Sequence, residues 1–223
     1  MPPLADSAPS APTPPPSLLL PPDILHRLDF AKIFGNGRPV ELELGCGDGS
    51  FLLKWSALHP ERNFVGVERL KGRVTKIDRK GRRQGLINLR GLRLEAAYVL
   101  EWMIPAASLS ALHVYFPDPW PKKRHHKRRL IQTPFTELAA RALRPDGVLY
   151  LRTDHAGYFQ QMEEVMAATT AFERLAEPAG LLDVKTDFEV GFNAEGKPTR
   201  HGAWRRRAVA EPFNTIPPGA SLR

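Results

Sequence analysis

Apolar and polar positions alternate in a regular way from about residue 39 to residue 207. Short apolar runs that fit buried strands cover residues 40–44, 63–67, 89–94, 112–116, 148–152, 172–175 and 203–207. Between several of these runs, apolar residues recur with helical spacing, as at Leu70, Val74 and Ile77. This alternation predicts an α/β fold, in which helices cover both faces of a mostly parallel sheet of seven strands.

Helix boundaries follow from the capping signals beside these patterns. Ser50 is expected to cap the helix that follows the first strand, and two more helices are predicted over residues 133–143 and 155–168. Residues 186–207 begin with a polar, Gly-containing segment and end at Trp204-Arg-Arg-Arg207. We expect this late part of the chain to form a loop and an antiparallel edge hairpin.

The two ends of the chain lack the alternation. The first 22 residues contain nine of the 22 prolines, with Ala and Ser between them. Such a composition cannot build a core, so we expect a disordered tail at 1–22. One domain is predicted over 23–210, with a short C-terminal tail at 211–223.

Composition narrows the class of protein. A chain of 223 residues with 42% hydrophobic residues is long and apolar enough to bury a core without disulfides or metals. The single cysteine, Cys46, excludes an internal disulfide. No apolar run approaches the roughly 20 residues that span a bilayer. We therefore expect a soluble, cytoplasmic protein without a membrane segment.

Charge is unevenly distributed along the chain. The formal net charge is +8, but residues 69–93 carry ten basic side chains and one acidic one, and residues 122–129 carry six basic side chains and no acidic one. The remainder of the chain is therefore acidic. Two basic segments in an acidic protein are the pattern expected of a nucleic-acid binder, although a charge run by itself is often only a solvated face.

The first strand runs into a glycine-rich turn. Gly45, Gly47 and Gly49 follow the strand at 40–44 and precede the first helix, where glycine allows a tight turn and close approach of a ligand. Glu68 ends the second strand 19 residues after Gly49. This spacing matches the acidic residue that binds ribose hydroxyls in nucleotide-binding folds.

Glu43 indicates which of two classes of nucleotide ligand the glycine-rich turn binds. A carboxylate just before the first glycine would repel a pyrophosphate, and Ser50 stands where a dinucleotide fingerprint has its last glycine. The same carboxylate could engage a cationic ligand. S-adenosylmethionine carries a sulfonium and an ammonium but no phosphate, so it is the cofactor expected here. Glu95, after the third strand, is placed to reach the adenine.

A second group of polar residues follows the fourth strand. Residues 116–129 read Phe-Pro-Asp-Pro-Trp followed by Pro-Lys-Lys-Arg-His-His-Lys-Arg-Arg. Ligands of open α/β sheets bind outside the carboxyl ends of the strands, which is where this segment places Asp118 and Trp120. The flanking prolines restrict the backbone around Asp118. Trp120 could stack on a base, and the basic run could hold phosphates.

Two further features complete the candidate site. Asp154 follows the fifth strand at the same edge of the sheet. His125 and His126 are adjacent, and on a helix they would point about 100° apart. No nearby carboxylate or cysteine completes a ligand set, so we expect no metal site.

Together these segments resemble the bacterial tRNA (guanine-N7-)-methyltransferase family. The stretch at 116–129 carries the resemblance, and the glycine loop, Thr153-Asp154 and a T-x-F-E element at 186–189 occur in the expected order. The resemblance covers roughly residues 38–207. It implies a Rossmann-like class I methyltransferase that methylates N7 of guanosine 46 in the tRNA variable loop, as a monomer or a homodimer.

The resemblance also implies roles for individual residues. Asp118 would be the catalytic residue and would also contact S-adenosylmethionine. The other implied cofactor contacts are Glu43, Gly45, Gly47, Gly49, Glu68 and Glu95. Implied contacts to tRNA or guanine are Lys122, Asp154, Thr186, Asp187, Phe188 and Glu189. The implied RNA-interacting stretch comprises Arg124, His125, His126, Lys127, Arg128 and Arg129.

Two positions differ from the family pattern, and other functions stay open at this stage. Glu95 stands where the family usually has Asp or Asn, and Asp187 stands where it commonly has Lys. One alternative is a nucleic-acid methyltransferase that acts on an exocyclic amine, although only one proline follows Asp118. A second is an RNA-binding module that has lost catalysis, against which the intact glycine loop argues. A nicotinamide dehydrogenase is disfavoured by Glu43 and Ser50.

Overall fold

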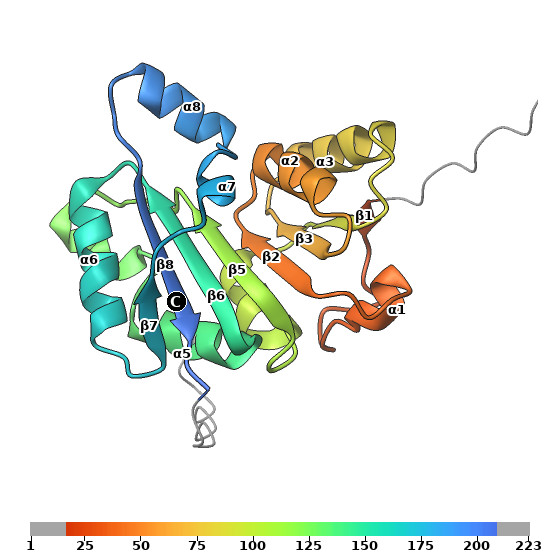
Figure 1. Cartoon of the computed structure of the whole chain (residues 1–223), viewed down its shortest axis with the longest axis horizontal. Coiled ribbons are helices and arrows are strands. Elements are labelled where there is room, and N and C mark those ends of the chain that lie inside the picture. The colour runs from red at the N-terminus through yellow and green to blue at the C-terminus, as the bar shows by residue number, and fades with distance from the viewer. Residues whose placement is uncertain (1–16, 209–223) are drawn as a thin grey trace, which may run out of the picture.

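The computed structural model describes residues 17–208, which form a sheet with helices on both faces (Figure 1). Within these residues eight strands pair in the order β1-β4-β3-β2-β5-β6-β8-β7. In this described sheet β8 runs antiparallel to both of its neighbours, β6 and β7, and the other pairs are parallel. The strands are β1 (Leu18–Leu19), β2 (Val40–Leu44), β3 (Asn63–Val67), β4 (Leu89–Leu92), β5 (Leu109–Tyr115), β6 (Leu143–Thr153), β7 (Phe172–Leu175) and β8 (Arg200–Arg206).

Helices connect most of these strands. The α-helices are α1 (Phe30–Phe34), α2 (Ser50–Leu58), α3 (Lys71–Arg83), α4 (Ala96–Tyr98), α5 (Thr133–Ala142), α6 (Ala156–Ala167), α7 (Ala179–Leu182) and α8 (Asp187–Ala194). A π-helical turn, η1 (Val99–Met103), and a 3-10 helix, η2 (Lys123–Arg128), complete the described elements. No helix within residues 17–208 is both long enough and apolar enough to cross a membrane.

Each face of the sheet has its own apolar core, because successive strand residues point to opposite faces. Leu42 and Leu44 belong to the larger core, which also contains residues of η1, α5 and α6. The second core contains residues of α2, α3 and α7. The prediction of helices on both faces of a mostly parallel sheet is therefore confirmed.

The eighth strand, β1, lies inside the segment that the proline content marks as a disordered tail. The backbone NH groups of Ser17 and Leu18 donate to the Asp78 carboxylate on α3, at 2.7 and 3.2 Å. Gly91 of β4 donates its NH to the carbonyl of Ser17 at 2.6 Å. For residues 17–19 the prediction of disorder is therefore wrong, because a side chain distant in sequence supplies the acceptor. The tails at 1–16 and 209–223 lie outside the described residues.

The helix after the glycine loop is capped differently from the prediction. Gly49 occupies the cap position with a φ of 78°, a left-handed conformation that favours glycine, and Ser50 is the first helical residue. A Cβ at position 49 would also lie 2.7 Å from Cγ1 of Ile77. The Ser50 hydroxyl instead accepts a hydrogen bond from the backbone NH of Asp187, at 3.0 Å.

The late segment predicted as a loop contains the helix α8. Thr186 caps it, with its hydroxyl accepting from the NH of Glu189 at 2.9 Å. Thr-x-x-Glu before an apolar residue is a capping-box pattern, so this sequence did contain the signal for a helix. The rest of the segment agrees with the prediction, because β8 pairs antiparallel with both β6 and β7.

Gly66, in the middle of β3, is required for close packing of the sheet against α2. A Cβ at this position would lie 2.5 Å from Cδ1 of Leu52 and 2.7 Å from the Cys46 thiol. We expect Gly66→Ala to lower the free energy of unfolding by about 1–3 kcal/mol through overpacking. Chemical denaturation followed by circular dichroism measures the change.

Gly72→Ala is the matched control, because a Cβ at helical position 72 meets no atom within 4 Å. It should be neutral or raise the free energy of unfolding by up to about 1 kcal/mol. Equal effects of the two substitutions would contradict the packing role of Gly66.

Candidate functional site

A cavity of about 790 Å³ opens at the carboxyl ends of β2 to β6. Parallel strands end at the same edge of a sheet, and this edge is the usual ligand site of open α/β folds. Four acidic side chains predicted from the sequence line this cavity, namely those of Glu68, Glu95, Asp118 and Asp154. The structure therefore brings together the residues that follow four different strands.

Backbone hydrogen bonds fix two of these carboxylates. Glu68 accepts from the NH of Leu70 at 2.8 Å, and its other oxygen lies 3.6 Å from the Arg73 guanidinium. Glu95 caps α4 by accepting from the NH of Tyr98 at 2.8 Å. Each carboxylate is thus oriented by the turn that follows its strand. A carboxylate has about four acceptor sites, so both retain capacity for a ligand.

The glycine loop at residues 45–49 has a left-handed backbone conformation at each of its three glycines. Gly45, Gly47 and Gly49 have φ values of 72°, 58° and 78°. Of the three, Gly45 lines the cavity. A Cβ at Gly47 would come within 3.7 Å of the Phe188 ring, so α8 packs directly over this loop. A ligand in the cavity would accordingly lie between the strand ends and α8.

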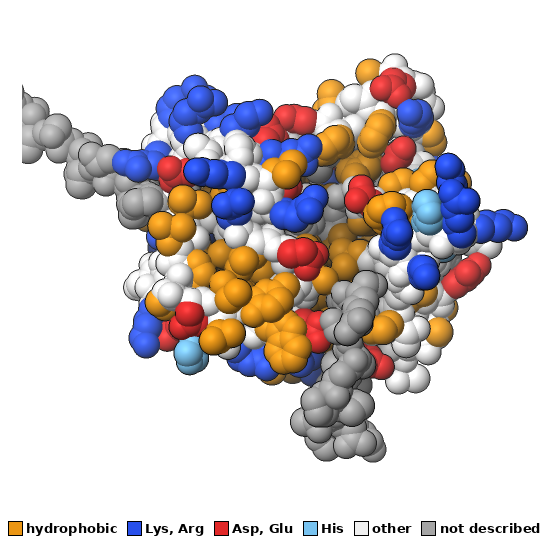
Figure 2. All heavy atoms as spheres, turned by 180° about the vertical axis from the view of Figure 1, so that it is seen from behind, with side chains coloured by type: hydrophobic (Ala, Val, Ile, Leu, Met, Phe, Trp, Pro, Cys, Tyr) orange, Lys and Arg blue, Asp and Glu red, His pale blue; other side chains and the backbone are white. Residues whose placement is uncertain are grey.

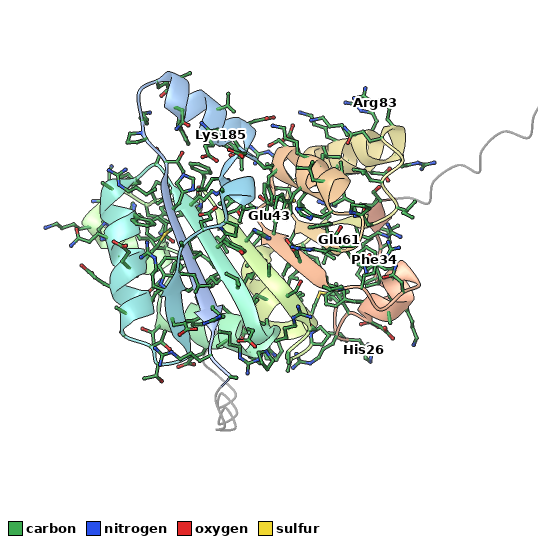
Figure 3. All side chains as sticks on the ribbon, viewed as in Figure 1. His26, Phe34, Glu43, Glu61, Arg83 and Lys185 are labelled. Atoms are coloured by element: carbon green, nitrogen blue, oxygen red, sulfur yellow. The ribbon has the colours of Figure 1, made fainter. Side chains whose placement is uncertain are left out.

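Glu43 lies deeper, on the sheet face toward α2 and α7 (Figure 3). Its side chain is buried, and its Oε2 has no hydrogen-bond partner among the described residues. Burial raises the pKa of Glu43 to about 8, and the nearby Arg152 charge offsets this only in part. Near neutral pH this carboxyl group is therefore largely protonated, with an oxygen available for a partner.

Glu41, two residues earlier on the same face, has the opposite environment. It accepts hydrogen bonds from His113 and Trp55, both at 2.9 Å, and from Arg62 at 2.7 Å. Burial alone would raise its pKa, but these donors lower it to about 2. Glu41 is therefore a satisfied structural carboxylate, whereas Glu43 is not.

Asp118 lies in a turn whose backbone is unusual. Phe116 and Trp120 on either side have φ values of 51° and 40°, which bulky side chains rarely adopt. The turn is anchored at its start by the NH of Phe116, which donates to the carbonyl of Arg152 at 2.8 Å. Such strained backbone persists only where the surrounding contacts hold it in place.

The helix α8 covers the cavity with aromatic side chains. Phe188 and Phe192 both line it, and Phe192 contacts Phe116 with ring centroids 5.6 Å apart. The Arg73 guanidinium lies 5.9 Å from the Phe188 ring. Phe188 is exposed, so its ring is available to a base or to a ligand.

The other residues of the T-x-F-E element face away from the cavity or support α8. Thr186 is the cap described above, and its neighbour Asp187 is exposed at the start of the helix. Glu189 is buried and forms an ion pair of 3.2 Å with Arg152. Thr186 and Glu189, two of the expected substrate contacts, thus already have partners that stabilise the helix.

Arg152 is a residue that the sequence did not point to. Its side chain is fully buried and donates to Glu177 at 2.6 Å and to the carbonyls of Leu181 and Val184 at 2.7 and 2.9 Å. Its guanidinium also lies 4.5 Å from the Tyr115 ring. This one side chain attaches the segment that carries α7 and α8 to the sheet.

Exposed basic residues lie on two sides of the site. Figure 2 shows Lys and Arg side chains gathered over α3 and again at the opposite edge of the molecule, with a hollow between them. Lys122, Arg124, Lys127 and Arg128 are exposed on or beside η2, and Arg128 lines the cavity. Arg129 also lines the cavity, but it is buried, and like the buried Arg90 it donates to a backbone carbonyl.

Comparison with known proteins agrees with this geometry. Residues 37–201 match a family described as "Putative methyltransferase". A tRNA (guanine-N(7)-)-methyltransferase of Vibrio parahaemolyticus is 38% identical over 179 residues, covering 79% of this chain and 75% of that protein. A protein of the same name from Sodalis glossinidius is 39% identical over 178 residues, covering 79% of this chain and 74% of that protein.

Among solved structures, the 16S rRNA methyltransferase KamB superposes with a TM-score of 0.57. The sequences are 18% identical, and the match covers 79% of this chain and 91% of that one. This similarity concerns the fold, which is that of the class I methyltransferases.

Replacing Arg152 should measure how strongly α7 and α8 depend on it. Arg152→Met leaves the buried carboxylates of Glu177 and Glu189 without their cation, so we expect a loss of about 3–5 kcal/mol in the free energy of unfolding. Urea denaturation at pH 7 measures this loss.

Arg205→Met is the control, because Arg205 forms its ion pair with Glu173 in a half-exposed position on β8. An exposed pair of this kind contributes only about 0–1 kcal/mol. A loss below about 1 kcal/mol for Arg152→Met would contradict the anchoring role.

Proposed function

Since the chain belongs to the tRNA (guanine-N7-)-methyltransferase family, we propose that it transfers a methyl group from S-adenosylmethionine to N7 of guanosine 46 in the tRNA variable loop. One structural observation supports this function most directly. Asp118, the expected catalytic residue, lines the same cavity as Glu68 and Glu95, the carboxylates expected to bind the ribose and the adenine. We further propose that it works in the cytoplasm, as a monomer or a homodimer.

The residues present fit the proposed cofactor. The glycine loop leaves room for close approach, while Glu68 and Glu95 keep acceptor sites for ribose hydroxyls and for the adenine amino group. The buried Oε2 of Glu43 offers a partner to a cationic group. When bound, S-adenosylmethionine supplies an electrophilic methyl group on a positively charged sulfur.

The reaction makes modest chemical demands on the protein. N7 of guanine has an in-plane lone pair and needs no deprotonation, so a general base is unnecessary. The chain must instead hold N7 in line with the methyl carbon, which can lower the barrier by about 7–11 kcal/mol. The purine becomes cationic during transfer, so a carboxylate fixed nearby stabilises the transition state.

Asp118 and Asp154 divide these tasks in our proposal. Asp118 sits in the rigid turn between Phe116 and Trp120, where it orients the base and compensates the developing charge. Asp154, which follows the neighbouring strand β6, accepts hydrogen bonds from N1–H and the amino group of guanine. Phe188 offers an aromatic face for stacking.

The exposed basic side chains would hold tRNA by its backbone. We propose that phosphates contact α3 on one side of the cavity and Lys122, Arg124, His125, His126, Lys127 and Arg128 on the other. Phosphate contacts orient a nucleic acid without reading its sequence. Because the cavity lies between the two groups, a base extruded from the loop would enter it (Figure 2).

Asp118→Ala should abolish methyl transfer while tRNA binding persists, because the carboxylate acts on the transition state. Unmodified tRNA is incubated with labelled S-adenosylmethionine, and the product is cleaved with chemistry specific for 7-methylguanosine. Binding is measured separately by filter retention.

Asp183→Ala is the matched control, since Asp183 is an exposed acid at the end of α7, outside the cavity. It should retain activity. Equal loss of turnover and binding in Asp118→Ala would overturn the catalytic assignment. Label on an exocyclic amine, or no label at all with the unaltered protein, would overturn the proposed function.

Cofactor binding should release a proton from Glu43. A pKa of about 8 leaves this group mostly protonated at pH 7, and a cationic ligand favours its charged form. Affinity for S-adenosylmethionine should therefore rise as pH increases toward about 8 and level off above it. Calorimetry at pH 6.5 and 8.5, in buffers with different ionisation enthalpies, measures the affinity and the released protons.

Glu43→Gln provides the comparison, because it removes this titration but leaves that of the cofactor's own amino group. Its affinity should depend less on pH than that of the unaltered protein. Identical pH profiles for the two proteins would contradict a contact between Glu43 and the cofactor.

A further inference from the structure

The two last arginines of the basic run, Arg128 and Arg129, have opposite environments. Arg128 is exposed, with its guanidinium 5.0 Å from the Trp120 ring. Arg129 is only 3% exposed, and burial lowers the pKa of its guanidinium. The first side chain is therefore open to a phosphate on the surface, whereas the second borders the cavity with its guanidinium already bonded inside the protein.

The buried guanidinium of Arg129 has a partner for each nitrogen. Its Nε donates to the carbonyl of Pro119 at 2.8 Å, and its Nη1 donates to the side-chain oxygen of Gln161 at 2.6 Å. Its Nη2 lies 3.0 Å from Nε2 of His126, and its carbon lies 4.7 Å from the Tyr158 ring. Gln161 and Tyr158 belong to α6, so these contacts attach Arg129 to a packed helix.

The hydrogen bond from Arg129 to the Pro119 carbonyl joins these contacts to the turn that carries Asp118. Pro119 directly follows Asp118 and precedes Trp120, whose φ of 40° is rarely adopted by a bulky residue. At its other end the turn is anchored by the bond from the NH of Phe116 to the carbonyl of Arg152. Arg129 thus links α6 to the carboxyl-terminal half of the turn.

We infer that Arg129 is a positioning residue for methyl transfer, which fixes Asp118 through the Pro119 carbonyl, and that it does not bind RNA. The inference rests on the proposed function, because it concerns the same turn. A misplacement of about 1 Å can reduce a rate about 100-fold. Only the planar guanidinium of arginine can donate to the Pro119 carbonyl and to Gln161 and at the same time lie beside the Tyr158 ring.

Arg129→Lys separates the two possible roles, because lysine keeps the charge and loses the planar guanidinium. We expect kcat for 7-methylguanosine formation to fall about 100-fold, while the Kd for tRNA and its dependence on salt stay unchanged. An Arg129 that bound phosphate would tolerate lysine. Retention of kcat would therefore overturn the inference.

The salt dependence of tRNA binding provides a test that does not need activity. Removing a phosphate contact should reduce the slope of log K against log salt concentration by roughly 0.7–0.9. Lys127→Gln, which removes an exposed charge of the same run, should show this reduction. Arg129→Gln should not, and a reduced slope for it would contradict the inference.

Two further variants test whether the fall in kcat comes from a general loss of folding. Gln161→Met removes one acceptor of the guanidinium while leaving Arg129 in place, and it should lower kcat with little change in KM. In a double-mutant cycle with Asp118→Asn, Arg129→Lys should add little to the loss already caused by Asp118→Asn, because both act through the same carboxylate. Fully additive losses would indicate a general structural effect and overturn the inference.

The outcome also distinguishes this inference from the proposed function. If the unaltered protein forms no 7-methylguanosine, the proposed function fails and the positioning role fails with it. If the unaltered protein is active and Arg129→Lys matches it in kcat, only the positioning role of Arg129 fails.

Discussion

The buried guanidinium of Arg152 is the interaction on which both walls of the cavity depend. Its side chain pairs with Glu177 and Glu189 and donates to two carbonyls beside α7, which attaches α8 to the sheet. Its backbone carbonyl accepts the NH of Phe116, which starts the turn that carries Asp118. A buried cation is tolerated only when it is paired and hydrogen-bonded. Here the partners of the guanidinium hold the aromatic cover, and the backbone carbonyl of the same residue holds the turn of Asp118.

The sheet face toward α2 and α7 combines satisfied and unsatisfied polar groups. Glu41 is surrounded by donors, and its pKa falls to about 2, whereas the pKa of Glu43 rises to about 8 because burial is not compensated there. The two carboxyl groups lie on the same strand and face. An uncompensated buried group costs free energy, and such a cost is commonly retained where a ligand supplies the missing partner. The carboxyl group without a partner therefore lies two residues before Gly45, and the satisfied one lies further back in the strand.

Strands β2 to β6 were predictable from this sequence because apolar residues recur along them. The convergence of Glu68, Glu95, Asp118 and Asp154 followed from the rule for parallel strand ends. Failures occurred where a partner distant in sequence decides the structure. Asp78 orders the strand at Leu18–Leu19, and no local pattern contains that information. Arg152 was likewise missed, because an arginine within a strand gives no sign of its buried partners. The capping box at Thr186, by contrast, is a local signal for a helix within a polar, Gly-containing segment.

Counting charges along the chain also overstates how many arginines can reach RNA. Arg90 donates to the carbonyls of Ile87 and Leu89, and Arg129 to that of Pro119, so two members of the basic segments act inside the protein. The cavity itself is lined by four carboxylates and by four arginines, Arg69, Arg73, Arg128 and Arg129. The carboxylates favour cationic groups inside the cavity, and the exposed basic residues outside it favour phosphates. The same field therefore suits both partners of the proposed reaction, since the polyanion stays outside the cavity while the methyl donor and the methylated purine carry positive charge.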